Sequence, residues 1–175
     1  MRNQAMNDVH YKSNSNDWKT PKALFDYWNN IYHFDIDAAA SKENALCERY
    51  YTQELDALKQ DWHKDGKNFW LNPPYGRLIG KFIKKAYEES FKGCNVVCLI
   101  PSRTCTQYFH KYVMGASEIH FIKGRLKFIN PSFPSYKEAE LLKLVPLLSH
   151  RRLLYSTILN SLNMDGEYVL STKTY

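Results

Sequence analysis

Two segments of the chain place apolar residues at the spacing of an amphipathic helix. Residues 22–31 follow Pro21, whose fixed φ suits the first turn of a helix. The apolar face predicted for this helix consists of Leu24, Phe25, Trp28 and Ile31. Residues 77–91 are the second segment, which Gly93 ends. Its apolar stripe consists of Ile79, Phe82, Ile83, Ala86, Tyr87 and Phe91.

Short apolar runs between and after these helices are typical of β-strands. They cover residues 34–37, 69–71, 96–100 and 119–122. The run 96–100 contains no polar position, as expected for a strand that is covered on both faces. Two further helices are predicted at residues 42–50 and 104–114. Strands that alternate with helices predict an α/β fold, with a mainly parallel sheet and helices on both faces.

Both ends of the chain differ from this alternating part. Residues 1–16 are polar and rich in asparagine, which predicts a flexible amino-terminal tail. Residues 17–136 form the predicted core. After Tyr136 the alternation is lost, and residues 137–175 form a divergent tail. One interpretation of this tail is a helical ending, with helices at 138–148 and 151–162 that are interrupted near Pro146.

Composition indicates one folded domain and suggests its kind of partner. The 175 residues are 44% hydrophobic and 15% aromatic, which argues for a globular fold and against disorder. No apolar run approaches the roughly 20 residues of a membrane span, and the amino terminus differs from a signal peptide, so we expect a soluble intracellular protein. The net charge of +6 and the pI near 9.0 favour a polyanionic partner. The cysteines lack the paired spacing of a zinc site and are predicted to be reduced core thiols: Cys47, Cys94, Cys98 and Cys105.

The predicted strand 69–71 is followed by Asn72-Pro73-Pro74-Tyr75, which suits a specific chemistry. The exocyclic amine of adenine is a poor nucleophile because its lone pair is delocalised into the ring. Two acceptors, the Asn72 side-chain oxygen and a backbone carbonyl such as that of Pro73, can draw this lone pair out of conjugation. Consecutive prolines hold both acceptors rigidly, and Tyr75 offers a ring on which an extruded base can stack. The alternative is that Asn-Pro-Pro is only a turn after the strand.

Other fragments surround this motif in a specific order. They are Trp18–Pro21, Phe34–Ala39, Arg49–Thr52, Asp61-Trp62, Asn72–Gly76, Ile100–Arg103 and Gly124–Phe128. In these fragments the chain resembles the phage-type DNA adenine N6-methyltransferases, a Dam-like family of the amino-methyltransferase superfamily with the Asn-Pro-Pro-Tyr motif. The resemblance implies a Rossmann-like, S-adenosylmethionine-dependent methyltransferase. It also implies a phage- or prophage-encoded enzyme that acts on double-stranded DNA in the bacterial cytoplasm, without a metal and without a membrane.

The resemblance also implies where the methyl donor S-adenosylmethionine binds. Trp18, Thr20 and Pro21 correspond to the segment that closes over the methionine end of the donor. Asp37, with Ala38 and Ala39, occupies the position of the first donor-binding motif, although many relatives have glycines where this chain has alanines. Asp61 corresponds to an acidic residue near the donor's adenine. The alternatives are that Asp37 caps the next segment and that Asp61 is a surface aspartate.

Two arginines are the predicted DNA contacts. Arg103 follows a buried strand and a proline, and Arg125 follows Gly124, so each can present its forked donors to a phosphate. For each, the alternative is a structural ion pair. The loops predicted to read bases are residues 51–67 and the segment after Phe128.

The tail suggests a change in the gene. Relatives have a glycine-rich loop and a closing apolar strand where this chain has residues 138–156. Back-translation with chosen codons gives a glycine-rich sequence one frame over, so we hypothesise a single-base frameshift that removes the closing strand. A divergent helical ending is the alternative.

The function predicted from the sequence is methyl transfer to adenine N6 in DNA. Asn-Pro-Pro-Tyr also occurs in enzymes that methylate RNA or a protein glutamine, because each acceptor presents a planar conjugated nitrogen. A third possibility is a DNA-binding protein whose catalysis the altered tail impairs.

Overall fold

The structure is a computed structural model that describes residues 19–114, 118–123, 126, 143–149, 160–162 and 168–170. The predictions for residues 1–16, Trp18 and Arg125 therefore lie outside the described residues. The same holds for the predicted base-reading segment from Phe128 to residue 142. Among the described helices, none is long and apolar enough to cross a membrane.

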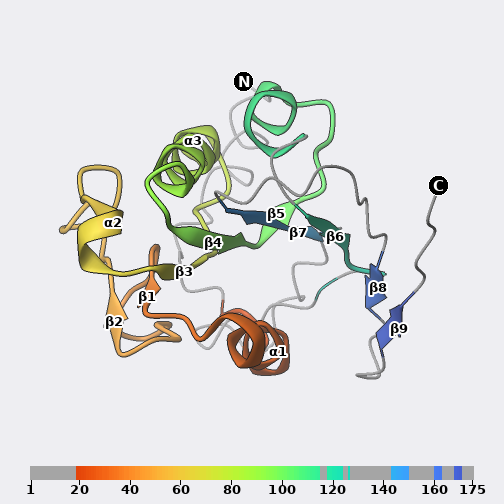
Figure 1. Cartoon of the computed structure of the whole chain (residues 1–175), viewed down its shortest axis with the longest axis horizontal. Helices are drawn as coiled ribbons and strands as arrows, with labels where there is room; N and C mark the ends of the chain where they lie inside the picture. The colour runs from red at the N-terminus through yellow and green to blue at the C-terminus, as the bar shows by residue number, and fades with distance from the viewer. Residues whose placement is uncertain are drawn as a thin grey trace, which may run out of the picture.

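A sheet of seven strands forms the centre of the fold (Figure 1). Its strands are β1 (Ile36–Asp37), β2 (Arg49–Tyr50), β3 (Asn68–Leu71), β4 (Asn95–Cys98), β5 (Ile100–Pro101), β6 (Ile119–Phe121) and β7 (Lys143–Leu148). They are ordered β2-β1-β3-β4-β7-β5, and β6 also pairs with β7. Strands β2, β1, β3 and β4 are parallel to one another, whereas β7 is antiparallel to β4, β5 and β6. Every strand except β7 therefore runs in one direction, and the predicted mainly parallel sheet is confirmed.

Helices cover both faces of this sheet, as predicted (Figure 1). Helix α1 (Lys22–Tyr32) lies on one face. Helix α3 (Ile79–Ser90), the short α2 (Trp62–Asp65) and the π-helix η1 (Phe109–Val113) lie on the other. A separate antiparallel pair is formed by β8 (Asn160–Leu162) and β9 (Tyr168–Leu170).

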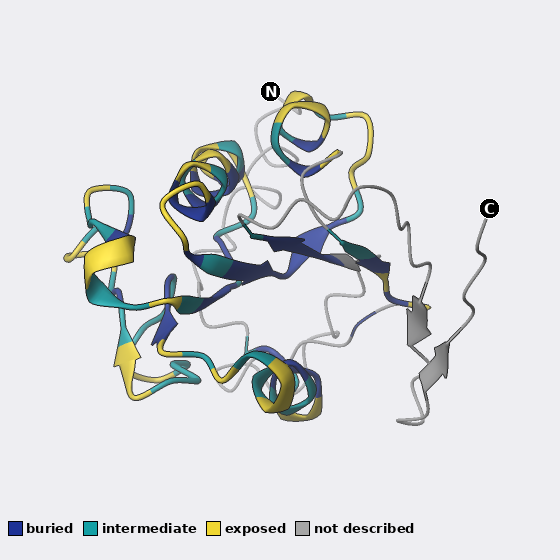
Figure 2. Cartoon of the chain, viewed as in Figure 1, coloured by how far each residue is buried: buried dark blue, intermediate teal, exposed yellow. Residues whose placement is uncertain are grey.

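The two faces of the sheet build two hydrophobic clusters, and the strands alternate between them. On β3, Phe69 and Leu71 pack with α3, whereas Trp70 packs with α1. This is the period of two that a pleated strand imposes on its side chains. Trp70 meets Phe25 of α1 edge-on, with ring centroids 5.5 Å apart. Burial on both faces explains why the central strands are apolar throughout, and Figure 2 shows them as buried.

The helix predicted for residues 42–50 is wrong, because these residues form turns and then strand β2. The backbone N–H of Ser41 donates to Asn44 Oδ1 at 2.6 Å, a local bond that competes with helix formation. Arg49 and Tyr50 then pair with β1. The predicted apolar faces are too wide at their ends, since Ile31 and Phe91 are about half exposed. Of the helix predicted at 104–114, the residues before 107 form turns instead.

The helical ending, the alternative interpretation of the tail, is also wrong where the structure describes these residues. Residues 143–148 form strand β7, and residues 160–162 form β8. Val145, Leu147 and Leu148 are buried, because β7 lies between β4 and the pair β5 and β6. Sheet pairing and burial therefore override the local helical tendency. A strand from the tail does occupy the sheet, contrary to the expected loss of a closing strand. The frameshift remains a proposal about the gene, which sequencing tests.

Candidate active site at the carboxyl edge of the sheet

The segments that leave three neighbouring parallel strands lie side by side at the carboxyl edge of the sheet. Ala38, just after β1, donates its backbone N–H to the Trp70 carbonyl at 2.8 Å. Leu99, just after β4, donates its N–H to the Leu71 carbonyl at 2.8 Å. The Asn72-Pro73-Pro74-Tyr75 segment therefore begins between these two segments, because β3 lies between β1 and β4. In open α/β sheets this is the edge where ligands bind.

Asn72 is held at both ends of its side-chain amide. Its Nδ2 donates to Oγ1 of Thr20 at 3.2 Å, and its Oδ1 accepts from the Tyr75 hydroxyl at 2.6 Å. The Tyr75 hydroxyl also lies 3.4 Å from the carbonyl oxygen of Leu99. Thr20 comes from the segment just before α1 and is 7% exposed. The structure thus brings two predicted site residues, Thr20 and Asn72, into direct contact.

Tyr75 closes this arrangement from the side of α3. Its ring packs against the hydrophobic cluster on that face of the sheet, and Pro73 before it is buried. Burial, with a smaller effect from Tyr108, raises the pKa of Tyr75 well above its ordinary value. The hydroxyl is therefore protonated and acts as a hydrogen-bond donor to Asn72. Any amine that is to bond to Oδ1 has to take the place of this hydroxyl.

Asp37 shapes the turn that follows β1. Its carboxylate accepts from the backbone N–H of Ala39 at 3.3 Å and from that of Leu46 at 3.2 Å. The residue is buried, and burial raises the pKa of its carboxyl to about 6 against the lowering effect of these two bonds. Ala38 is fully buried, while Ala39 and Ala40 are partly exposed. The side chains that follow Asp37 are small, which suits the close approach of a ligand to the backbone of this turn.

Asp61 is not brought to this edge. Its oxygens lie 2.7 Å from Nζ of Lys64 and 3.2 Å from Nζ of Lys92, which precedes β4. Asp61 therefore lies toward the amino ends of the strands, beside the last turn of α3. The opposite charges of the two lysines hold it there and lower the pKa of its carboxyl to about 2. Its predicted place near the donor's adenine has no support in this position.

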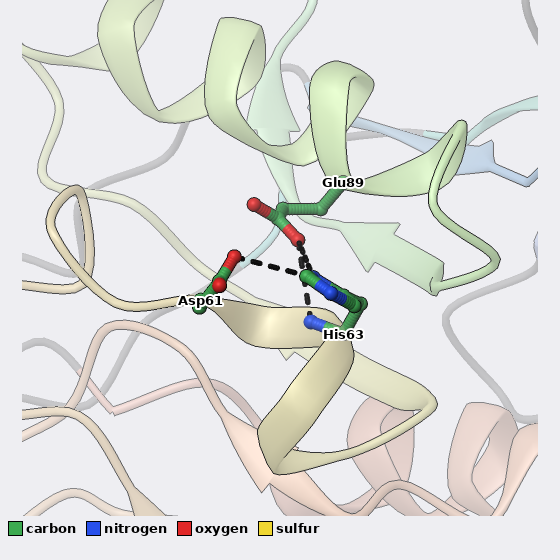
Figure 3. A group of neighbouring side chains, drawn as sticks. All are labelled: Asp61, His63 and Glu89. Carbon is green, nitrogen blue, oxygen red and sulfur yellow. Dashed lines mark hydrogen bonds and ion pairs between the residues drawn. The ribbon is translucent and has the colours of Figure 1, made fainter.

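Asp61, His63 and Glu89 form a group whose ligand atoms all lie within 4.8 Å of one another (Figure 3). Such a spacing can suit a metal ion, but the Glu89 carboxylate already accepts from Lys85 at 2.7 Å and from Lys92 at 2.9 Å. A metal ion here would have to displace these ammonium groups. We interpret the group as a structural network that joins α2 to the end of α3.

Arg103 and the cysteines are the other residues that were predicted from the sequence and that the structure describes. Arg103 follows β5 and is exposed, and it forms no ion pair with any described residue. Cys94 and Cys98 are buried, as predicted, whereas Cys105 is exposed.

An open hollow of about 360 Å³ lies along the outer strand β2 and does not include Asn72. We give it no role in this site, because Thr20 and Asp37 are also absent from its lining.

Comparison with known proteins finds a matching family model and relatives of similar sequence. The family model described as "DNA N-6-adenine-methyltransferase (Dam)" matches residues 8–151. A DNA N-6-adenine-methyltransferase of Escherichia phage T1 is 40% identical over 110 residues, which are 62% of this chain and 45% of that protein. One of Haemophilus phage HP1 is 30% identical over 122 residues, 68% of this chain and 69% of that protein. The matched region thus spans less than half of the phage T1 relative.

Proposed function

Because the chain belongs to the family of DNA N-6-adenine-methyltransferases (Dam), we propose that it transfers a methyl group to the N6 amine of adenine in double-stranded DNA. The observation that carries the proposal is the Asn72 amide, held by Thr20 and Tyr75 where β3 ends. The same edge presents the turn after Asp37. An acceptor base and a methyl donor can therefore meet over the same strands.

In the proposed reaction, the chain's residues prepare the amine. The extruded base stacks on the Tyr75 ring, and its amine replaces the Tyr75 hydroxyl at Asn72 Oδ1. This bond, with one to the Pro73 carbonyl, localises the lone pair on nitrogen. The nitrogen then forms a bond to the methyl carbon while the carbon–sulfur bond breaks and its electron pair goes to sulfur, and the methylated nitrogen, now cationic, loses one proton to water. S-Adenosylmethionine, when bound, supplies the electrophilic methyl group.

The turn formed by residues 37–40 fits a donor of this kind. Its alanines are small, and Asp37 fixes the backbone with two hydrogen bonds. We propose that Asp37 acts by holding this turn rather than by lending a free oxygen to the donor, because both carboxylate oxygens already accept bonds. Arg103, exposed beyond β5, is the proposed phosphate contact among the described residues.

Methyl transfer from radiolabelled S-adenosylmethionine to DNA, RNA and protein tests the proposed function. We expect label in double-stranded DNA, recovered as N6-methyladenine after digestion to nucleosides. Label only in RNA or in protein glutamine would move the same chemistry to another acceptor. Binding of DNA without any transfer would leave a DNA-binding protein and would contradict the proposal.

Tyr75 variants separate its ring from its hydroxyl. We expect Tyr75→Phe to keep most of the turnover, because the substrate amine replaces the hydroxyl at Asn72 before the transition state. Tyr75→Ala should lose about 1–3 kcal/mol of base stabilisation, since the stacking surface is gone. Steady-state rates on a short duplex measure both. Equal losses from the two changes would show that the hydroxyl rather than the ring is required.

Asp37 variants test the methyl-donor turn. Asp37→Ala leaves the N–H groups of Ala39 and Leu46 without their acceptor, so we expect S-adenosylmethionine affinity to fall by about tenfold or more. Asp37→Asn keeps one oxygen acceptor and the side-chain volume, and should lose less. Calorimetry measures the binding, and circular dichroism checks the fold. If DNA affinity collapsed while donor affinity stayed the same, Asp37 would have no part in the donor site.

A further inference from the structure

The Asn72 amide can adopt two orientations that differ by a half-turn, and only one of them suits the proposed reaction. The oxygen end of an amide accepts hydrogen bonds, whereas the nitrogen end only donates them. An amine at the site needs the oxygen. If the amide turned over, Nδ2 would face the base and repel its amine hydrogens. The Tyr75 hydroxyl, which donates to Oδ1, favours the productive orientation before a base binds, and the donating amine favours it afterwards. The amide must in addition be held in this plane while the two donors exchange.

Proline rigidity does not hold the amide plane, because it fixes the backbone and leaves the amide torsion free. The contacts of the amide do. Thr20 Oγ1 lies 3.2 Å from Nδ2, and the Tyr75 hydroxyl lies 2.6 Å from Oδ1. With the amide reversed, the Tyr75 hydroxyl would lose its 2.6 Å bond to Oδ1, and the Leu99 carbonyl at 3.4 Å is a more distant acceptor.

The Tyr75 bond is lost when a base enters, so it cannot hold the amide during the reaction. Thr20 can, because it binds the opposite end of the amide and is 7% exposed, away from the place that the base takes. Thr20 and Asn72 are 52 residues apart, and the bond joins the segment before α1 to the end of β3.

We propose that Thr20 is a positioning residue that anchors the far end of the Asn72 amide and so holds the amide plane fixed while the substrate amine binds its oxygen. This inference rests on the proposed function for its kinetic consequence. It gives Thr20 a role distinct from closing over the methyl donor. A residue that acts on the donor changes donor affinity, whereas a residue that orients Asn72 changes the rate of the chemical step.

Thr20→Val and Thr20→Ser test this role. Valine keeps the shape of threonine and removes the hydroxyl, so kcat should fall by about tenfold, the effect of one net hydrogen bond. S-Adenosylmethionine affinity should change by no more than about twofold, less than the loss of one hydrogen bond would cause. Serine restores the hydroxyl and should restore most of kcat. The control is Ser90→Ala, which removes a buried hydroxyl bonded to the Tyr87 carbonyl far along α3 and should leave kcat unchanged.

A second measurement does not depend on methyl transfer. The side-chain amide resonance of Asn72 in ¹⁵N-labelled protein, assigned by its loss in Asn72→Asp, reports the bond from Nδ2. We expect slow hydrogen exchange of this amide in the wild type and in Thr20→Ser, and faster exchange in Thr20→Val.

These measurements distinguish a failure of the Thr20 proposal from a failure of the proposed function. An unchanged kcat in Thr20→Val, a loss confined to donor affinity, or a serine variant as slow as the valine variant would each overturn the proposal. Unchanged amide exchange in Thr20→Val would overturn it as well. If the wild-type chain transferred no methyl group to DNA, the proposed function would fail, and the exchange measurement would still decide whether Thr20 orients Asn72.

Discussion

Asn72→Ala is expected to lower turnover by about a hundredfold or more, because loss of one transition-state hydrogen bond in a dry site costs on the order of 3 kcal/mol. The Asn72 oxygen is the side-chain acceptor in the proposed reaction. It already accepts a hydrogen bond from the Tyr75 hydroxyl, so a donor can reach it. The affinity for S-adenosylmethionine should stay close to that of the wild type, since the turn after Asp37 is unchanged. Single-turnover rates and donor calorimetry measure the two quantities separately.

A matched control for this variant lies at the other end of the same strands. Asn95 donates its side-chain amide to Asn68 Oδ1 at 2.8 Å, where β4 and β3 begin. Asn95→Ala removes an asparagine of the sheet without touching the carboxyl edge and should keep wild-type turnover. If Asn72→Ala kept near wild-type turnover as well, Asn72 would not be the acceptor.

The second large effect concerns stability. Glu89→Ala should lower the free energy of unfolding by about 3 kcal/mol, because it leaves the partly buried Lys85 without its partner. The Glu89 side chain is only 1% exposed, and it also accepts the backbone N–H of His63 at 3.2 Å. Urea unfolding measures the loss. The neighbouring Glu88→Ala is the control, since Glu88 pairs with Lys84 in solvent and should change stability by less than about 1 kcal/mol.

The same network predicts a pH dependence. Burial alone would raise the pKa of Glu89, but the hydrogen bonds from Lys85 and Lys92 outweigh it, and the pKa lies below the ordinary 4.5. A lowered folded-state pKa stabilises the fold above the unfolded value, and this stabilisation is lost as pH falls through the folded value. The difference in stability between wild type and Glu89→Ala should therefore shrink below about pH 4.5. A difference that stayed constant to lower pH would show that the carboxylate charge is not responsible.

Local patterns were sufficient to predict much of the fold. The apolar spacing of α1 and α3 and the short apolar strands β1, β3 and β4 depend on residues close in sequence, and the structure contains each of them. Residues 42–50 and 143–148 were predicted as helices and are turns or strands. Their conformation depends on pairing with distant strands and on bonds such as that from Leu46 to Asp37. Contacts between residues that are distant in the chain produce no periodic pattern in the sequence, so periodicity cannot predict them.

The sequence by itself determined the contiguous parts of the site. Asn72-Pro73-Pro74-Tyr75 could be recognised because its members adjoin one another, and the alternation of strands and helices placed it at a sheet edge. Only the tertiary structure decided which distant residues join it. Thr20 contacts Asn72 across 52 residues, whereas Asp61, predicted for the same site, is held beside α3 by Lys64 and Lys92. The physical reason is that a hydrogen bond or an ion pair needs two groups within about 3–4 Å, and that distance is set by how the strands pair and the helices pack.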